Sequence, residues 1–517
     1  MSFETYSNSL IRYPQFGFSL DTSKLDLAAG LPDGIDEKIS RAFDDMAAVE
    51  AGEIANPDEN RMVGHYWLRA PRLAPNDELR RQITEPLADL KKFTEEVHSG
   101  AIGPAPGKQF KRLLLIGIGG SALGPQLVDD ALGYAARLPI HFLDNTDPDG
   151  IDRVLGEIGR DGLAKTLVMV ISKSGGTAET RNGMMETKAA FEAAGLNFGQ
   201  HAVAITGEGS KLDDFAKKHE FLEVFPMEDW VGGRTSVMST VGLVPAALQG
   251  IDIDQLLAGA AEMDELTRQT DAEKNAAMRL ALAWYAAGKG RGEKDMVVLP
   301  YKDSLLLFSR YLQQLVMESL GKRLDLDGNE VKQGIAVYGN KGSTDQHAYV
   351  QQLRDGVENF FVTFIEVRKG REGESVEVEP GSNSADFLQG FLRGTRRALA
   401  ESGRPSITLS IPEVNAYQLG VLIALFERTV SFYASLVRIN AYHQPGVEAG
   451  KKAASAFLET LHAVRSRLVA DAKTAETIAY EVDADPEDVY HCLNHLASNG
   501  EAQLSLGREP KDDRFSL

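Results

Sequence analysis

The feature that most constrains the fold of this chain is an apolar run that ends in a cluster of glycines. Residues 112–121 read RLLLIGIGGS, with a basic start, an apolar run and a glycine turn. This pattern is typical of a buried parallel strand that enters a tight turn before a helix. Two more apolar runs follow, at residues 139–144 (PIHFLD) and 166–172 (TLVMVIS), and helical patterns separate them. The alternation predicts a parallel sheet with helices on both faces.

The same alternation returns in the second half of the chain. Because 517 residues are too many for one hydrophobic core, we predict an α/β fold with two doubly wound, three-layer αβα domains and a small C-terminal helical unit. The later strands are predicted at 296–300, 334–338, 360–366 and 406–411, and long helices at 304–323 and 416–438. The expected parts are a mostly helical segment that packs on the second domain (1–100), the first domain (101–250), the second domain (251–471), and an appendage of two short helices around Asp485-Pro486 with a short terminal strand or arm (472–517).

Composition limits the partners and the compartment. The formal net charge is -20, and a surface this acidic repels polyanions, so we expect no nucleic-acid partner. The single cysteine, Cys492, excludes an internal disulfide. The N-terminus lacks the basic flank and apolar run of a signal peptide, and apolar stretches such as 419–426 are shorter than the ~20 residues of a membrane span. We therefore expect a cytoplasmic protein with no membrane partner.

The first glycine loop, residues 117–122 (GIGGSA), is compatible with two kinds of ligand. A glycine turn that opens a helix lets an anion approach backbone N–H groups. The spacing also satisfies a loose dinucleotide-binding pattern, and Asp144 ends the next strand, where an acid that binds ribose could lie. A nicotinamide-dependent dehydrogenase therefore stays open at this point.

The loop after the third strand favours a phosphosugar. Ser172, Lys173, Ser174 and Thr177 gather three hydroxyls and an ammonium at one helix N-terminus, and Gly175-Gly176 permits close approach. Hydroxyl donors and the helix dipole suit a terminal phosphomonoester. A helix cap would explain one hydroxyl but not all four polar groups, and a dinucleotide site would not need this second loop.

Three side chains in the middle of the chain could carry the chemistry. Arg234 follows Gly232-Gly233 at the entry to an apolar helix, where it could hold a negative charge that develops during a reaction. Gln314 and Glu318 are four residues apart and share one face of a leucine-rich helix. A carboxylate in such a setting either pairs with a cation or acts as a base. Taken singly, a surface arginine and a solvated glutamate are the commoner cases.

Two later segments add a histidine and a lysine. His347 is predicted in the first turn of a helix after the polar loop GNKGST, and a lone histidine of this kind is more often structural. Gln444 precedes Pro445-Gly446, which opens a helix, and Lys451 lies a turn or two inside it. A lysine there can reach a sugar oxygen or a phosphate, although most helical lysines are solvated.

Six segments together carry a resemblance to a known family. GIGGSALGP, SKSGGTAET, DWVGGRTSV, QLVMESLGK, GSTDQHAYVQQ and INAYHQPGVEAGK span about residues 112–452. In this order they resemble the glucose-6-phosphate isomerase family, and their residues are most similar to those of its cyanobacterial and plastid branch.

The resemblance implies two sugar-isomerase (SIS) domains, a homodimer with shared active sites, and interconversion of glucose 6-phosphate and fructose 6-phosphate through a cis-enediolate in glycolysis and gluconeogenesis. It implies neither a metal nor a cofactor. It further implies that His347 lies across the dimer interface from Glu318. By resemblance, Ser172, Ser174 and Thr177 bind the phosphate with Lys173, Gly120 and Ser121 nearby; Glu318 moves the proton; Arg234 stabilises the enediolate; His347 and Lys451 assist ring opening; and Gln314 and Gln444 contact the substrate.

The chain departs from the family pattern at several positions. Leu320 stands where many members have Asn, residues 441–443 (AYH) replace the commoner Pro-Phe-Asp, and Ser174-Gly175-Gly176 is a variant of a more Thr-rich loop. We expect effects on affinity rather than on the reaction. A non-catalytic sugar-phosphate-binding protein and an enzyme for another phosphosugar, such as mannose 6-phosphate, remain alternatives. The acidic C-terminal appendage is predicted to support packing or dimerisation and not to bind DNA.

Overall fold

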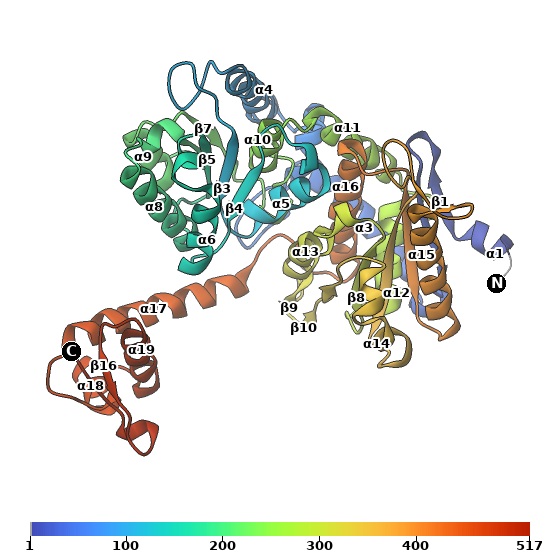
Figure 1. Ribbon diagram of the computed structural model, residues 1–517. Helices are drawn as coiled ribbons and strands as arrows, with labels where there is room; N and C mark the ends of the chain where they lie inside the picture. Colours follow the sequence, from blue (N-terminus) through green and yellow to red (C-terminus); the bar gives the residue numbers. More distant parts are fainter. Residues whose placement is uncertain (1–2) are drawn as a thin grey trace. The chain divides into compact units, whose positions relative to one another are not determined.

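The computed structural model describes residues 3–517, apart from the side chains of residues 447–449. The chain divides into two compact units, Met1–His443 and Gln444–Leu517, and each is described by itself. The first unit contains two large sheets, of five and six strands, with helices around them (Figure 1).

The first sheet is parallel throughout and has the order β4-β3-β5-β6-β7. Alternate residues of β3 point into two different cores, Leu113 and Leu115 into one and Leu114 and Ile116 into the other. Helices therefore cover both faces, which confirms the doubly wound prediction. The strands are β3 (Arg112–Ile116), β4 (Ile140–Leu143), β5 (Thr166–Ile171), β6 (Ala202–Thr206) and β7 (Glu223–Pro226), of which β6 and β7 were not predicted.

Six helices flank this sheet. On one face lie α4 (Asp77–Ser99), α5 (Gly120–Leu132) and α10 (Thr240–Gln249); on the other lie α6 (Pro148–Ile158), α8 (Ala178–Ala193) and α9 (Lys211–Lys218) (Figure 1). Both α5 and α8 begin at the carboxyl ends of strands, β3 and β5 respectively. Loops at the carboxyl ends of parallel strands are where ligands bind in open α/β sheets.

The second sheet has the order β1-β2-β15-β12-β8-β11. Its four inner and edge strands β8, β11, β12 and β15 are parallel, whereas β2 runs antiparallel to β15 and β1 antiparallel to β2. Val297 and Leu299 of β8 face one core, and Met296 and Val298 face the other. The strands are β1 (Leu10–Tyr13), β2 (Phe18–Lys24), β8 (Asp295–Pro300), β11 (Val337–Tyr338), β12 (Phe360–Val367) and β15 (Ser406–Ile411).

The N-terminal segment does more than the predicted helical packing. It supplies β1 and β2 to the second sheet, and α3 (Ile35–Glu50) packs on α16 (Ala416–Leu436). Its last helix, α4, instead packs on α10 and β7 beside the first sheet. The segment thus contacts both sheets, and a domain boundary near residue 250 stays a prediction. Further helices of this unit are α1 (Phe3–Asn8), α2 (Leu27–Gly30), α7 (Arg160–Leu163), α11 (Ile253–Thr267), α12 (Ala276–Gly288), α14 (Val350–Asp355) and α15 (Ser384–Glu401).

The predicted helix over 304–323 is interrupted. It starts as α13 (Phe308–Leu312), continues as a π-helical turn over Gln313–Glu318, and gives way to the short strand β9 (Lys322–Leu324), which pairs with β10 (Glu330–Gln333). Turns of π-helix inside helices occur frequently at functional sites. This one carries both Gln314 and Glu318.

Among the described residues, α16 is the single helix that is long and apolar enough to cross a membrane, and it is wholly buried in protein. Its Arg428 and Glu427 join Arg69 and Asp264 in a buried ionic cluster, with Arg69 Nε 2.6 Å from an Asp264 carboxylate oxygen. This pattern identifies α16 as a core helix that ties the N-terminal segment to α11.

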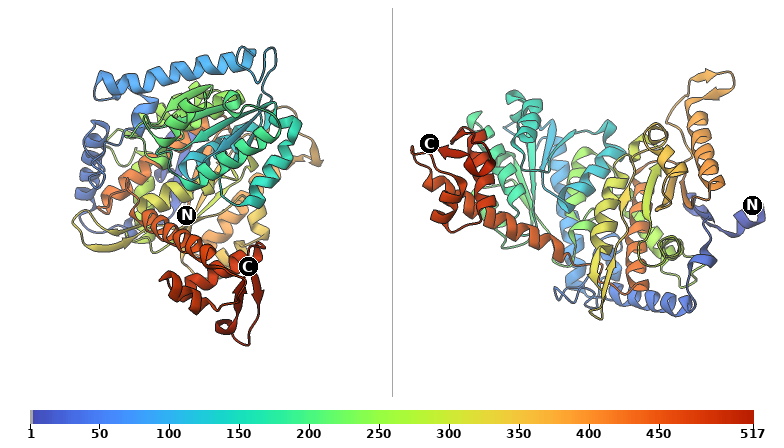
Figure 2. Two further views of the ribbon diagram at one scale, coloured as in Figure 1. Left: turned by 90° about the vertical axis from the view of Figure 1, so that its left-hand side faces the viewer. Right: turned by 90° about the horizontal axis from the view of Figure 1, so that it is seen from below.

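The second unit packs α18 and α19 against α17, as Figure 2 shows. Its core includes Val464 of α17, Ile478 of α18, Cys492 of α19 and Phe515 of the terminal hairpin. The prediction of two short helices followed by a strand is confirmed, although α17 packs with them. The elements are α17 (Pro445–Arg467), α18 (Ala475–Val482), α19 (Pro486–Ser498), β16 (Gln503–Ser505) and β17 (Arg514–Ser516).

Candidate active site

The first glycine loop lies directly against the loop that carries Arg234. A Cβ atom added at Gly120 would come 2.1 Å from the carbonyl oxygen of Gly233, and Ser236 Oγ donates to the Gly120 carbonyl at 3.2 Å. A Cβ added at Gly119, whose φ is +59°, would lie 3.3 Å from Gln314 Nε2. The turn at Gly119–Ser121, the Gly233 loop and the π-helical turn therefore meet at one place.

The second loop gathers its hydroxyls at the N-terminus of α8. Ser172 Oγ donates to Thr177 Oγ1 at 3.3 Å, and Ser174 Oγ accepts from the backbone N–H of Gly176 at 3.2 Å. In the part of the chain that the structure describes, the Thr177 side chain does not cap α8. The capping explanation thus fails for Thr177, and the site retains the properties of an anion-binding helix terminus.

Lys173 points away from those hydroxyls. Its Nζ donates to the carbonyl oxygens of Asp229, at 2.9 Å, and Val231, at 3.1 Å, and lies 3.4 Å from Asp229 Oδ1. Burial lowers the pKa of Lys173, and Asp229 partly offsets this effect. In this arrangement Lys173 ties the Ser172 loop to the loop before Arg234, so a direct contact with substrate stays a prediction.

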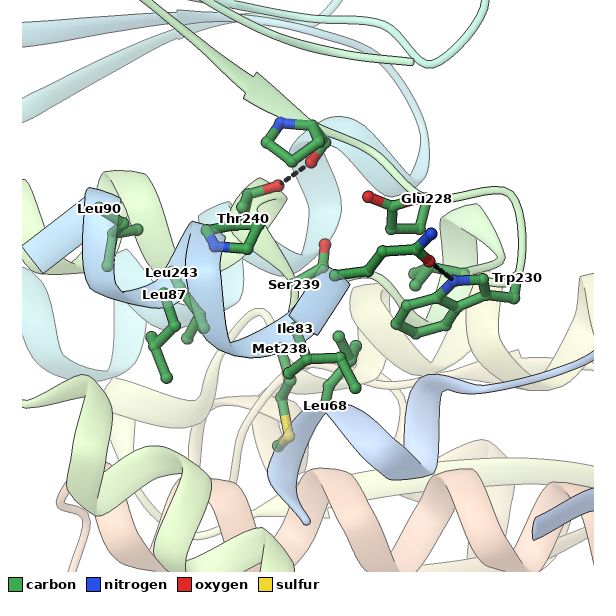
Figure 3. Close-up of a pocket in the computed structure, with 14 residues that line it drawn as sticks. Leu68, Ile83, Leu87, Leu90, Glu228, Trp230, Met238, Ser239, Thr240 and Leu243 are labelled. Atoms are coloured by element: carbon green, nitrogen blue, oxygen red, sulfur yellow. Dashed lines mark hydrogen bonds between the residues drawn. The ribbon is translucent and has the colours of Figure 1, made fainter. Parts of the chain in front are cut away.

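The loop before Arg234 is anchored on α4 through Trp230. The indole Nε1 donates to Gln82 Oε1 at 2.9 Å (Figure 3). The Trp230 ring also packs on that of Trp67, with 5.5 Å between the ring centroids. A cavity of about 30 Å³ lies beside Trp230 and is lined mainly by apolar side chains, Ile83 and Leu243 among them. This volume is far below the several hundred Å³ of a ligand pocket, so the cavity is not the substrate site.

Arg234 and Glu318 form the central pair of the site. Arg234 is buried, and its Nε donates to Glu318 Oε2 at 3.1 Å. Its other nitrogens donate to Ser319 Oγ at 3.3 Å and to the carbonyl oxygens of Ala441, at 2.5 Å, and His443, at 3.3 Å. Burial lowers the pKa of Arg234, and the Glu318 carboxylate counteracts it. The guanidinium thus joins the π-helical turn to residues 441–443, while the Glu318 side chain stays 22% exposed and within reach of a ligand.

Lys322 was not predicted as a residue of the site. This side chain is buried, and its Nζ donates to the main-chain carbonyl of Glu318 at 2.6 Å. Burial, with Arg234 nearby, lowers the pKa of Lys322 to about 7. The available indication was a lysine four residues after a candidate base, at the end of the same helical segment.

His347 lies apart from this pair within the chain. It is exposed at the end of a 3-10 turn, Thr344–His347, in which the buried Asp345 accepts from the Asn340 N–H at 2.9 Å. Among the described side chains, no hydrogen bond or ion pair joins His347 to Glu318 or Arg234. Its predicted role, at a site completed by a neighbouring subunit, stays a prediction.

Gln444 and Lys451 belong to the second unit. Gln444 is the N-cap residue of α17, and Lys451 lies in the second turn of that helix. Their predicted contacts with substrate stay predictions. Across residues 3–517 as described, no group of three or more His, Cys, Asp or Glu side chains is arranged to hold a metal ion, and independence of metals and cofactors is likewise still a prediction.

Comparison with known proteins identifies the family. The sequence model described as "Phosphoglucose isomerase" matches residues 36–400 and 396–478, most of the chain. The chain belongs to this family. Curated phosphoglucose isomerase relatives named "Glucose-6-phosphate isomerase" include one from Rippkaea orientalis, 59% identical over 96% of this chain and 95% of its own, and one from Thermosynechococcus vestitus, 58% identical over 99% and 98%. These relatives confirm the predicted family and its cyanobacterial branch.

A solved phosphoglucose isomerase has the same fold. The crystal structure of a glucose-6-phosphate isomerase from Chlamydia trachomatis superposes with a TM-score of 0.79 at 27% identity, over 89% of this chain and 92% of that one. The predicted pair of αβα sugar-isomerase domains is therefore confirmed. The dehydrogenase alternative loses its support, since Asp144 is engaged by Gln126 Nε2 at 2.8 Å and by Arg310 at 3.3 Å.

Proposed function

We propose that this chain interconverts glucose 6-phosphate and fructose 6-phosphate, with Glu318 carrying the proton and Arg234 holding the charge of the enediolate. The chain is an aldose–ketose isomerase of the phosphoglucose isomerase family. The main observation behind these roles is the Arg234–Glu318 pair at 3.1 Å, in a unit that also presents a hydroxyl-lined helix terminus at α8.

The proposed substrate lies between the two glycine loops and the π-helical turn. Its phosphate accepts hydrogen bonds from Ser172, Ser174 and Thr177 at the N-terminus of α8, where the helix dipole favours an anion. The sugar extends past the turn at Gly120 towards Gln314 and Glu318. This pose is supported by the contact of Gly119 with Gln314 and of Gly120 with Gly233.

The proposed reaction begins with ring opening, in which the anomeric hydroxyl loses its proton and the ring oxygen gains one, assisted by His347 and Lys451. Glu318 then removes the proton from C2, and the electron pair of the C–H bond enters the enediolate. The proton of the O2 hydroxyl passes to O1, and the same carboxyl group returns its proton to C1, so that a C2 carbonyl and a C1 hydroxyl form and the product is the ketose. A base that takes and returns one proton is standard general acid–base catalysis.

The pairing of Arg234 with Glu318 suits this proton transfer electrostatically. When Glu318 takes the proton, its negative charge disappears, and an equal charge develops on the enediolate oxygen. Because both charges would lie within reach of one guanidinium, Arg234 keeps one anionic partner throughout the step. A preorganised cation of this kind stabilises developing charge without reorganisation.

Three further parts of the proposal concern the whole protein. A homodimer would bring His347 of one subunit to the neighbouring site, and the exposure of the His347 side chain supports this arrangement. A cytoplasmic location fits a soluble metabolic enzyme. A non-catalytic sugar-phosphate-binding protein is not favoured, because it has no use for a buried arginine paired with a partly exposed carboxylate.

The test combines a coupled assay with a binding measurement. Purified chain without added metal should convert fructose 6-phosphate to glucose 6-phosphate. Glu318→Gln should lose turnover by about 10³-fold or more and still bind the substrate, whereas Glu85→Gln, an exposed residue of α4, should match the wild type. Full activity of Glu318→Gln would contradict the role of Glu318, and absence of turnover in the wild type would contradict the function.

A further inference from the structure

The carbonyl group of Glu318 has an unusual partner for the end of a helix. The last carbonyls of a helix lack intrahelical donors and need another group. The neighbouring carbonyl of Met317 accepts from the backbone N–H of Gly321 at 2.8 Å, but Lys322 already belongs to strand β9. Instead, Lys322 Nζ turns back and donates to the Glu318 carbonyl at 2.6 Å. The main chain of the proposed base is therefore held by a side chain.

Burial of the Lys322 amine at this position costs desolvation free energy. Lys322 is 5% exposed. In the part of the chain that the structure describes, the nearby carboxylates of Glu318 and Asp58 pair with Arg234 and His443 and not with the Lys322 Nζ. The charged groups that face it are Arg234, which opposes a second positive charge, Glu318 and Asp58, which favour one, and His443 beside Asp58. An apolar side chain would avoid the desolvation of an amine at this position.

We propose that Lys322 is a positioning residue of the isomerase, which holds the main chain of Glu318 at the end of the π-helical turn and so keeps the carboxylate in place against Arg234 and C2 of the substrate. The inference rests on the proposed role of Glu318. Lys322 does not touch the substrate in this account, and it acts through the base.

Glu318 is held at its carboxylate and at its main chain, and this fixes the position of the proposed base. Arg234 binds the Glu318 carboxylate and also Ser319 Oγ, while Lys322 binds the Glu318 main chain from the other side. A base displaced by about 1 Å can lose on the order of 10²-fold in rate. A neutral amine still has N–H donors, although it donates more weakly than an ammonium, so the hydrogen bond persists in a weaker form when Lys322 titrates.

The experiment compares Lys322→Met with a matched control in the full-length enzyme. Methionine keeps the length and removes the donor and the charge, so kcat should fall by about 10²-fold while KM stays within about twofold. Lys302→Met is the control, because Lys302 Nζ likewise donates to main-chain carbonyls, those of Lys369 and Gly370, away from Glu318. This control should keep the kcat of the wild type.

A second readout separates positioning from general stability. Loss of a positive charge makes neighbouring carboxylates easier to protonate, so the acid limb of the kcat–pH profile should move to higher pH in Lys322→Met. Lys322→Arg, which restores a donor and a charge, should recover at least about tenfold of the lost kcat. If Lys322→Met does not fold, the kcat of Lys322→Arg is the test of the positioning role. It should lie within about tenfold of the wild type.

Other results would overturn the inference. These are a kcat of folded Lys322→Met within about threefold of the wild type, a loss confined to KM, an unmoved acid limb, or an inactive but folded Lys322→Arg. An active Lys322→Met beside an inactive Glu318→Gln would refute only the positioning role. An active Glu318→Gln would instead refute the proposed function on which it rests.

Discussion

Replacing Arg234 with lysine tests whether the guanidinium or merely a positive charge is needed at the site. Within the described part of the chain, Arg234 donates from three nitrogens to at least four acceptors: the Glu318 carboxylate, Ser319 Oγ and the carbonyls of Ala441 and His443. A lysine has one nitrogen and three N–H groups on a flexible stem, so it cannot hold all of these partners. Arg234→Lys therefore keeps the charge and loses the geometry.

The expected magnitude follows from what remains after the change. Removing one preorganised donor to a developing oxyanion costs on the order of 10²–10³ in kcat. Arg234→Lys retains a charge near the enediolate, so we expect a loss of about 10²-fold, and of about 10³-fold for Arg234→Met, which retains none. Stability should fall less than the 3–5 kcal/mol typical of breaking a buried ion pair, because the Glu318 side chain is 22% exposed and can be hydrated.

The assay is steady-state kinetics in both directions, with the melting temperature measured alongside. Arg404→Lys is the matched control, because Arg404 is also buried and donates to the carbonyls of Arg354 and Gly356, away from Glu318. It should lose stability without losing kcat. An Arg234→Lys enzyme with kcat within about threefold of the wild type would refute the reasoning, since charge alone would then suffice.

Three further predictions follow from single contacts. Gly120→Ala places a Cβ 2.1 Å from the Gly233 carbonyl oxygen and should lower kcat/KM by about 10²-fold. The control Gly150→Ala has open space around its Cβ and should keep the kcat/KM of the wild type. Equal kcat/KM values for the two variants would contradict the close packing of the loops. The native pKa of Lys322 is about 7 and the unfolded value is 10.5, so the unfolded chain binds more protons than the native chain between these two pH values, and stability should rise with pH there. From pH 7 to 9 the melting temperature of the wild type should therefore increase relative to that of Lys322→Met. A constant difference between the two melting temperatures would argue against the lowered pKa. Deleting the residues after Ala472 uncovers the apolar side of α17 and should reduce the melting temperature and dimer content while sparing kcat; an inactive but folded dimer would contradict this.

The sequence was sufficient for the first sheet up to β5 because each of those strands is a mainly apolar run next to a glycine or polar turn. Strands β3 and β5 are almost wholly buried, whereas β4 is only partly buried. The sequence was insufficient for β7 (Glu223–Pro226), which is short and ends in proline, a residue that sequence rules place outside strand interiors. The β1–β2 hairpin was also missed. Its connection contains Pro14 and Gly17, and its pairing with β15 depends on residues almost 400 positions away.

The parts of the site formed by residues close together in the sequence could be predicted. The parts formed by contacts between distant segments could not. The hydroxyls of Ser172, Ser174 and Thr177 lie within six residues, so their meeting at α8 follows from the sequence. The direction of Lys173 depends on the carbonyls of Asp229 and Val231, which no local pattern reveals.

The same limit applies to the central pair. Arg234 and Glu318 lie 84 residues apart, and only the docking of the Gly233 loop on the π-helical turn brings them to 3.1 Å. The π-helical turn itself escaped prediction because its sequence pattern is that of an ordinary apolar helix.

Whether Glu318 moves a proton between C2 and C1 can be measured by running the reaction in D₂O and following the products by NMR. The account predicts that the wild type converts fructose 6-phosphate to glucose 6-phosphate and that deuterium accumulates at C2 of the product over many turnovers, since a carboxyl group exchanges its proton with solvent. Glu318→Gln should show neither. Conversion without any deuterium at equilibrium, or conversion and exchange that persist in Glu318→Gln, would contradict the account.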